Sequence, residues 1–386
     1  MDIVVATTDG VVHFFEPEIE YTASNEGYDA DDNGERWQHE TDITIVRSNP
    51  AISSFNGGND VVISGIDLDN DEINVIAIDG STGDRIWKFT EEGTEISSPA
   101  VLADGSNRQV FVSIYNDGLE VYGIQGGSPI NNWSPKPIGS VVDPDDVEKA
   151  ITNKTRMIVV NSPSNPTGAV MTKEELTKVY EIAEKYDLFL LSDEIYARMI
   201  YQENGIDFFS PSSLDHCKEH TIIVNGFSKS YAMTGWRIGY AAGPKEIIKA
   251  IGKIQSQSTS NPSSVSQAAA VEALNGTQDF IQERSDAFKE RRDFVVNSLN
   301  NIKGISCLKP NGAFYVFPSC KKLLGKKTKL KTDSEFVEKL LEKANVAVVQ
   351  GSAFGLDGYF RISYATSMEK LKIAMERIKS FCESLS

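Results

Sequence analysis

The pattern of apolar and polar positions divides the chain into two parts. Residues 1 to about 138 contain short apolar runs separated by turns rich in Gly, Asp and Asn, without helical spacing. From about residue 139 onward, continuous apolar runs such as 157–161 (MIVVN) and 221–228 (TIIVNGFS) alternate with amphipathic stretches. The first pattern predicts an all-β part, and the second predicts an α/β part with a parallel, doubly wound sheet.

The second part also carries signals for its helices. Asp143 opens a helix that reaches about residue 151, and Thr172 with Glu175 forms a capping box for a helix that ends near residue 186. A long helical stretch, about 278–299, leads to a smaller region containing GAFYVF and FRISYA. With a boundary in the Gly- and Pro-rich stretch 126–140, the predicted domains are 1–138, 139–285 and a small C-terminal α/β domain, 286–386.

The first part repeats itself. SNPAI at 48–52 returns as SSPAV at 97–101, and Trp37, Trp87 and Trp133 recur at intervals of 50 and 46 residues. A period in the forties with several strands per repeat is typical of propeller blades. The segment AIDGSTGDRIW at 77–87 resembles the tryptophan-docking repeat of quinoprotein-type (PQQ-like) β-propellers. The resemblance implies incomplete propeller-like blades, with Gly83 forming a turn and Trp87 packing between sheets.

Charge supports the same division. The net charge is −17; residues 1–140 carry 6 Lys and Arg against 25 Asp and Glu, and the remainder carries 32 against 30. An acidic first part argues against a nucleic-acid or anionic-membrane partner there. No apolar run has membrane-spanning length and the N-terminus lacks a positively charged signal region, so we expect a cytoplasmic protein without a membrane partner. The four cysteines have no paired spacing, which favours reduced structural thiols.

Three polar clusters have the composition of metal sites, but none of them is predicted to bind a metal ion. One acidic loop has the spacing of a calcium-binding EF-hand loop without flanking helices, a second lacks the glycine and the distal carboxylate, and a His-Cys-x-x-His segment lies in an expected surface connection. A lysine-rich run at 321–331 is expected to be a solvated loop. The three clusters are Asp29, Asp31, Asn33, Gly34 and Glu40; Asp67, Asp69 and Asp71; and His216, Cys217 and His220.

The strongest chemical signal is the stretch 224–240, VNGFSKSYAMTGWRIGY. Lys229 follows an apolar strand, at the position where open α/β sheets bind ligands. The hydroxyl of Ser228 beside it and the guanidinium of Arg237 beyond it are suited to hold a phosphate while the amine does covalent chemistry. The stretch therefore predicts a Schiff-base lysine.

Four ordered motifs carry a family resemblance. NSPSNPTGAV (161–170), LSDEIY (191–196), FSKSYAMTGWRIGY (227–240) and FRISYAT (360–366) resemble the signatures of class I aminotransferases, pyridoxal phosphate (PLP) enzymes of fold type I. The stretch 254–276 resembles the bacterial aspartate and prephenate aminotransferase subgroup. The resemblance covers about 139–386, the C-terminal part of such an enzyme, and implies a homodimer.

The resemblance implies a role for each matching residue. Lys229 would form the internal aldimine and carry the proton, and Asp193 would keep the pyridine nitrogen protonated. Asn165 and Tyr196 would hydrogen-bond the ring oxygen. Ser228 and Arg237 would hold the phosphate, and Arg361 would bind the α-carboxylate of the substrate as a bidentate pair.

The family's N-terminal motifs, including the aromatic that stacks on the cofactor, have no counterpart in residues 1–138, and Gln350 replaces a usual proline. We therefore expect transamination of an amino acid such as aspartate with a 2-oxo acid, impaired by the loss of that part. The loss of the sheet strands in the family's N-terminal part is also expected to expose apolar faces of the α/β sheet. One alternative is a non-catalytic binding or scaffold protein, or a fused chain whose enzyme half is a remnant. Another is a β-lyase or decarboxylase of the same fold type, since the motifs do not separate these reactions.

Overall fold

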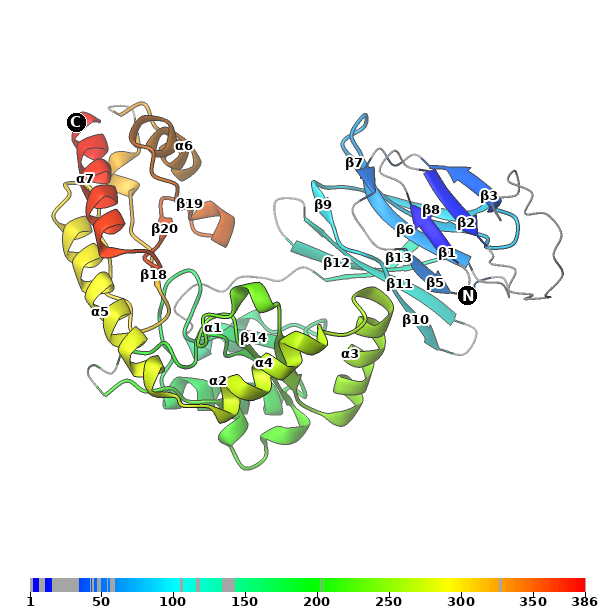
Figure 1. The fold of residues 1–386 in the computed structure, drawn as a ribbon, viewed down its shortest axis with the longest axis horizontal. Helices are drawn as coiled ribbons and strands as arrows, with labels where there is room; N and C mark the ends of the chain where they lie inside the picture. The colour runs from blue at the N-terminus through cyan, green and yellow to red at the C-terminus, as the bar shows by residue number, and fades with distance from the viewer. Residues whose placement is uncertain are drawn as a thin grey trace, which may run out of the picture. The chain divides into compact units, whose positions relative to one another are not determined.

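A computed structural model divides the chain into two compact units (Figure 1). One unit comprises Met1–Lys136 with Lys249–Asn261, and the other comprises Pro137–Ile248 with Pro262–Ser386. The main division falls within the expected boundary stretch, whereas the finer domain limits stay a prediction. The residues described are 3–6, 11–15, 35–41, 43, 45–46, 50–53, 55, 60–104, 107–115, 119–133, 143–201, 203, 205–325 and 328–385.

Every regular element among the described residues up to 133 is a β-strand, and all strand pairs are antiparallel. The strands form three sheets, which confirms an all-β first part over these residues. The sheets consist of β1 (Ile3–Ala6), β2 (Val11–Phe15) and β3 (Glu35–Glu40); β4 (Ile45–Val46), β5 (Ala51–Ser53), β6 (Asp60–Asp67), β7 (Glu72–Ile78) and β8 (Arg85–Glu92); and β9 (Glu95–Ile96), β10 (Ala100–Asp104), β11 (Asn107–Tyr115), β12 (Leu119–Gln125) and β13 (Ser128–Trp133).

The second and third of these sheets share one hydrophobic core. Val62 and Val75, from β6 and β7, belong to the same buried cluster as Val112 and Ile124, from β11 and β12. Strand β6 is buried along its whole length, so its apolar residues face packed side chains on both sides. Burial of apolar area between the two sheets is therefore the main force that holds this unit together.

Trp87 lies where these two sheets meet. Its ring packs edge-on against Phe55 with 5.8 Å between centroids. A Cβ added to Gly127, in the turn between β12 and β13, would come within 3.1 Å of the Trp87 Cβ, so that hairpin lies directly on the tryptophan. Gly83 has φ +80°, as its predicted turn requires. Trp87 thus makes the inter-sheet contact expected of it, while the resemblance to quinoprotein-type propellers stays a prediction.

The second acidic cluster forms a backbone turn. The Asp67 carboxylate accepts hydrogen bonds from the Asp69 N–H at 3.0 Å and from the Asn70 amide at 2.8 Å. Residues 29–34 of the first acidic loop lie outside the described residues. Within the described residues, no three His, Cys, Asp or Glu side chains are grouped closely enough to hold a metal ion. The four cysteines are buried free thiols.

The second unit contains a four-stranded sheet in the order β14 (Met157–Asn161), β15 (Phe189–Asp193), β16 (Thr221–Gly226) and β17 (Gly239–Ala242). Strands β14, β15 and β16 are parallel, as predicted. Strand β17 is antiparallel to β16, so the prediction of a fully parallel sheet was wrong. A parallel crossover needs a long connection, usually a helix, and the short segment between β16 and β17 contains only the 3-10 turn η3 (Thr234–Trp236).

Two helices begin where the sequence predicts. The Asp143 side chain caps α1 (Pro144–Ala150). Thr172 and Glu175 form the capping box of α2 (Lys173–Lys185). Each cap satisfies backbone N–H groups that have no partner within the first turn of the helix.

These helices cover one face of β14. Val147 of α1 and Val179 of α2 pack in one cluster with Ile158 of β14. On the opposite face, Met157 is 39% exposed and Val159 is 63% exposed. Among the described residues, helices therefore cover β14 on one side only, whereas a doubly wound sheet is covered on both. The exposed pair agrees with the expectation that apolar sheet surface is left uncovered.

The C-terminal region is a small α/β layer. Its aromatic core joins Phe336, Phe360 and Phe381, with ring centroids 5.2 and 5.6 Å apart. Helices α5 and α7 pack side by side (yellow and red in Figure 1), and α5 confirms the predicted long helix. A separate small C-terminal domain stays a prediction. The remaining regular elements after residue 143, inside and outside this C-terminal region, are α3 (Lys245–Ser258), α4 (Ser264–Asn275), α5 (Asp279–Asn300), α6 (Asp333–Ala344), α7 (Met368–Ser384), β18 (Tyr315–Val316), β19 (Val349–Gln350), β20 (Phe360–Ser363), η1 (Pro211–Ser213), η2 (Cys217–Glu219), η4 (Lys321–Leu323) and η5 (Ser352–Phe354). None of the described helices is long and apolar enough to cross a membrane.

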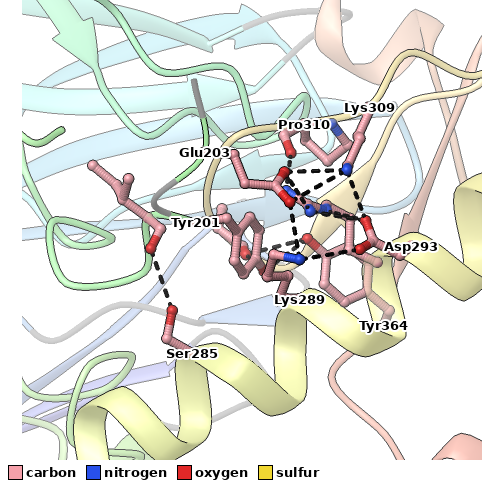
Figure 2. Close-up of polar contacts among 11 residues, drawn as sticks. Tyr201, Glu203, Ser285, Lys289, Asp293, Lys309, Pro310 and Tyr364 are labelled. Carbon is pink, nitrogen blue, oxygen red and sulfur yellow. Dashed lines mark hydrogen bonds and ion pairs between the residues drawn. The ribbon is translucent and has the colours of Figure 1, made fainter. Parts of the chain in front are cut away.

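A charged cluster ties the chain after β15 to α5. The guanidinium of Arg292, whose side chain is fully buried, lies 2.8 Å from carboxylate oxygens of Glu203 and Asp293. Lys289 and Lys309 approach Glu203 to 2.9 and 3.1 Å. Figure 2 shows Glu203, Lys289, Asp293 and Lys309 pointing toward one another. We call these five residues the Arg292 cluster.

This cluster predicts a loss of stability in acid. Lys289, Lys309 and Arg292 lower the pKa of Glu203 to about 2, from an ordinary value of 4.5. A carboxylate with a lowered folded-state pKa stabilises the fold above its ordinary pKa and loses that contribution as pH falls toward 2. We expect Glu203→Gln to lower the unfolding midpoint at pH 7 and to match the unsubstituted chain near pH 2. Denaturant unfolding at a series of pH values measures this; a pH-independent difference between the two chains would contradict it.

Candidate active site

Three predicted site segments lie at one edge of the sheet. Asn161 ends β14 and is in register with Asp193, which ends β15. Lys229 follows the last residue of β16, Gly226, after two intervening residues. Because the carboxyl ends of parallel strands meet at one edge, the fold brings the Asp193 carboxylate and the Lys229 segment together there.

Asp193 is half-buried and held by its neighbours. Its carboxylate accepts a hydrogen bond from the backbone N–H of Ile195 at 3.1 Å. Its backbone carbonyl accepts one from the Asn161 side chain at 3.2 Å. Burial raises the pKa of Asp193, and the Ile195 N–H opposes that shift. A carboxylate in this state favours a cation beside it, because the cation offsets the desolvation of its charged form.

Arg361 lies against Asn165, 196 residues away in the sequence. The guanidinium of Arg361, on β20, donates to the Asn165 side-chain oxygen at 2.8 Å, and the Asn165 backbone N–H donates to the Asn161 side chain at 2.7 Å. The guanidinium also lies 4.7 Å from the Tyr315 ring centroid and 4.9 Å from that of Phe354. These aromatic faces hold Arg361 at the edge of the sheet.

Tyr196 and Lys229 are the other two predicted site residues that lie near Asp193, Asn165 and Arg361. The Tyr196 hydroxyl is 2.9 Å from the Tyr315 hydroxyl, and burial raises the pKa of Tyr196, which keeps its proton available for donation. The Lys229 ammonium lies 5.8 Å from the ring centroid of Tyr196 and 5.5 Å from that of Phe314. Asn165, Asp193, Tyr196, Lys229 and Arg361 are thus linked through direct contacts or one shared neighbour.

Ser228 and Arg237 are not joined in this way. Arg237 is exposed, with φ +48°, and its guanidinium donates to the backbone carbonyl of Thr234 at 3.1 Å. Within the described part of the chain, no hydrogen bond or ion pair connects Arg237 to Ser228. Their joint role in holding a phosphate stays a prediction.

Sequence reasoning missed Phe314 and Tyr315, which contact Lys229, Tyr196 and Arg361. Both lie in the segment GAFYVF, which the sequence analysis places only in the small C-terminal α/β region. Adjacent aromatic residues in an apolar run are an ordinary core signal. Nothing local in the sequence marks them as neighbours of a lysine more than eighty residues away.

With this geometry in place, comparison with known proteins gives the family. Residues 113–378 match the family "Aminotransferase class I and II". The chain belongs to this family. Enzymes of this aminotransferase family depend on PLP, which agrees with a lysine and a carboxylate at the end of neighbouring strands. The aminotransferase match begins at residue 113, within β11. Strands β12 and β13 therefore belong to the matched sequence, although they lie in a sheet of the first unit.

Two curated relatives show what this aminotransferase chain is similar to. It is 49% identical over 266 residues to the aspartate aminotransferase of Rhizobium meliloti (strain 1021), covering 67% of this chain and 64% of the relative. It is 45% identical over 269 residues to the aspartate/prephenate aminotransferase of Cereibacter sphaeroides (strain ATCC 17029 / ATH 2.4.9), covering 68% and 67%.

Solved structures give the same fold for the C-terminal region. The crystal structure of the aspartate aminotransferase from Rhizobium meliloti superimposes with a TM-score of 0.61 at 50% identity, covering 64% of this chain and 63% of that one. The aromatic aminotransferase from Pyrococcus horikoshii OT3 gives a TM-score of 0.59 at 42% identity, over 64% and 65%. The chain thus spans just under two thirds of the length of these proteins.

The residues present fit PLP. Its aldehyde requires an amine, which Lys229 supplies, and its ring nitrogen requires an anionic partner, which the raised-pKa carboxylate of Asp193 supplies. The Tyr196 hydroxyl, which contacts Tyr315, and the Asn165 amide, which contacts Arg361, add hydrogen-bonding groups to the same set of residues. The donor set of this part of the chain therefore matches the chemistry of the family's cofactor.

Proposed function

We propose that this chain catalyses PLP-dependent transamination between an amino acid such as aspartate and a 2-oxo acid. The observation that carries the proposal is the contact group of Lys229, Tyr196, Asp193, Asn165 and Arg361 at one sheet edge. Aspartate is the first candidate substrate because the curated relatives are named aspartate or aspartate/prephenate aminotransferases.

Each side chain has a proposed role. PLP supplies an electron sink for the bond that breaks at the substrate α-carbon. The Lys229 amine binds the cofactor covalently and carries the proton from that carbon. Asp193 stabilises a protonated ring nitrogen by charge, and Asn165 and Tyr196 donate hydrogen bonds to the ring oxygen.

Arg361 is proposed to bind the substrate carboxylate. Its guanidinium donates one hydrogen bond to the Asn165 oxygen and stacks on Tyr315 and Phe354, which fixes its plane. A planar fork held in this way suits bidentate recognition of a carboxylate, which lysine would not reproduce. Ser228 and Arg237 are the proposed phosphate ligands, supported only by the family motif around Lys229.

A homodimer and a cytoplasmic location are part of the same proposal, and they rest on the family resemblance and on the sequence. The expected impairment and the scaffold alternative rest on the missing N-terminal motifs, and the relatives give no support to either. A β-lyase or decarboxylase would use the same amine and carboxylate. Product identity distinguishes these reactions from transamination.

The proposal is tested by adding PLP to the purified full-length chain and recording its visible absorbance. We expect a band of protein-bound PLP that changes when aspartate is added, with formation of the matching 2-oxo acid and consumption of 2-oxoglutarate. No bound band at saturating PLP would overturn the proposal. A band with release of ammonia or carbon dioxide would instead assign the chain to the alternative reactions.

Asp193→Asn gives a sharper test of the cofactor geometry. Loss of the carboxylate removes the charge that favours a protonated ring nitrogen, so we expect turnover to fall by about 100-fold or more. The matched control is Asp187→Asn, at an exposed position with φ +52° where asparagine is well tolerated. Steady-state kinetics with both variants measures the effect; equal rates for the two would rule out the role of Asp193.

A further inference from the structure

A cavity of about 210 Å³ opens beside Lys229 within the second unit. Met199, Phe288 and Phe314 supply apolar walls, and Arg198 and Arg284 lie at its lining as well. Both arginines are exposed, whereas Met199 is buried. The cavity is therefore apolar inside with cationic groups toward solvent, which is the usual composition of a site for a small organic anion.

This cavity shares part of its lining with the proposed cofactor site. Its lining includes Ser228 and Lys229 but none of Asn165, Asp193 or Arg361. Those three residues belong to the contact group at the end of β14, β15 and β20. The cavity therefore adjoins the proposed cofactor site at Ser228 and Lys229, and the other three residues of that site do not line it.

The charge of the lining is positive. Arg198, Lys229 and Arg284 line the cavity, and no aspartate or glutamate does. Arg198 donates to the neutral Gln278 amide oxygen at 3.2 Å, and the Arg284 guanidinium stacks on Phe280 at 4.6 Å. Among the described residues, neither guanidinium forms an ion pair with a carboxylate. Their charges are thus available to an anionic ligand.

The size of the cavity and the chemistry of its walls narrow the class of ligand further. A cavity of about 150 Å³ accepts a benzene ring, so about 210 Å³ has room for one ring with a short acid chain. Phe288 and Phe314 are stacked with centroids 5.6 Å apart, and both aromatic faces and the Met199 thioether pack well on a further aromatic ring. We propose that this cavity binds an aromatic monocarboxylate, with its ring against these walls and its carboxylate held by Arg198 and Arg284.

Because Ser228 and Lys229 belong both to this cavity and to the proposed cofactor site, the test uses the full-length chain without PLP. The probe is 4-fluorophenylacetate, followed by fluorine NMR. We expect a saturable shift with the unsubstituted chain, and at least tenfold weaker binding of the neutral probe 4-fluorophenylacetamide. Because no cofactor is added, failure of PLP to bind leaves this titration unaffected.

Variants locate the site. The double variant Arg198→Gln/Arg284→Gln is expected to bind the acid at least tenfold more weakly, whereas Arg377→Gln, an arginine outside the cavity, is expected to bind within twofold of the unsubstituted chain. Ile281→Trp, which fills the cavity from a lining position, is expected to abolish the shift. Thermal unfolding confirms that each variant is folded. No saturable shift in the unsubstituted chain, equal binding of acid and amide, or full binding by the folded Ile281→Trp variant would each overturn the proposal.

Discussion

Lys229→Ala is expected to lower the rate of transamination by at least about 1,000-fold, because it removes the amine that is proposed both to hold PLP and to carry a proton. The ammonium it removes lies over the rings of Tyr196 and Phe314, and cation–π contacts of this kind contribute about 1 kcal/mol. The fold should therefore survive the substitution. Steady-state kinetics and the visible spectrum with PLP measure the two consequences together.

The matched control is Lys178→Ala on the exposed side of α2, where alanine is a good helix former. It is expected to leave both the spectrum and the rate unchanged. If Lys229→Ala unfolds at the same temperature as the unsubstituted chain yet retains its rate within about tenfold, the amine is not the catalytic group. A loss of rate together with a loss of folded protein would be reported by the thermal midpoint and corrected for the folded fraction.

The elements of the second unit were predictable because local signals there agree with tertiary packing. Thr172 and Glu175 mark the start of α2, and the apolar runs ending at Asn161 and Asp193 form adjacent parallel strands. Strand ends in such a sheet share an edge, so the placement of Lys229 beside them followed from chain order. A segment of this kind can be predicted from sequence because its local preferences and its tertiary packing favour the same structure.

Two features were not predictable for a physical reason. The direction of β17 depends on the length of its connection to β16, and an apolar run is the same sequence in either direction. The pairing of Arg361 with Asn165 joins residues 196 positions apart, and no periodicity encodes such a contact. The family motifs indicated both residues, but only the fold brings their atoms within hydrogen-bonding distance.

In the first unit, the sequence signals were short and ambiguous. Trp87 and Gly83 occupy the packing and turn positions expected of them. The Asp67 cluster has the composition of a calcium site, and its hydrogen bonds stabilise a turn. Carboxylates serve both purposes, so composition alone did not separate a ligand set from a turn.

The Arg292 cluster is expected to make a large contribution to stability. Arg292 is fully buried, donates to the Pro310 carbonyl at 3.0 Å, and lies 4.4 Å from the Tyr201 ring centroid in addition to its two carboxylates. Figure 2 shows Tyr201 and Tyr364 close to the cluster, and their hydroxyls are 2.9 Å apart. Lys289 and Lys309 also reach the two carboxylates, whereas the contacts to the Pro310 carbonyl and the Tyr201 ring come from Arg292.

Arg292→Met is expected to destabilise the second unit by about 3 kcal/mol, because breaking one member of a buried ion-pair network leaves the remaining charges and a carbonyl without their partner. The lower end of the usual 3–5 kcal/mol range applies, since Lys289 and Lys309 still approach the two carboxylates. Arg291→Met, the neighbouring position on α5, is the control and should cost under about 1 kcal/mol, as its guanidinium lies over the Phe288 ring at 5.3 Å.

Hydrogen exchange of α5 under increasing denaturant measures this difference within the second unit, so unfolding of the other unit does not contribute to the signal. Arg292→Lys keeps the charge but loses the planar fork, and should fall between the unsubstituted chain and Arg292→Met. If methionine at position 292 proves neutral, apolar packing on Tyr201 replaces the ion pairs in full. The acid sensitivity of the fold would then rest on the pairs of Glu203 with Lys289 and Lys309.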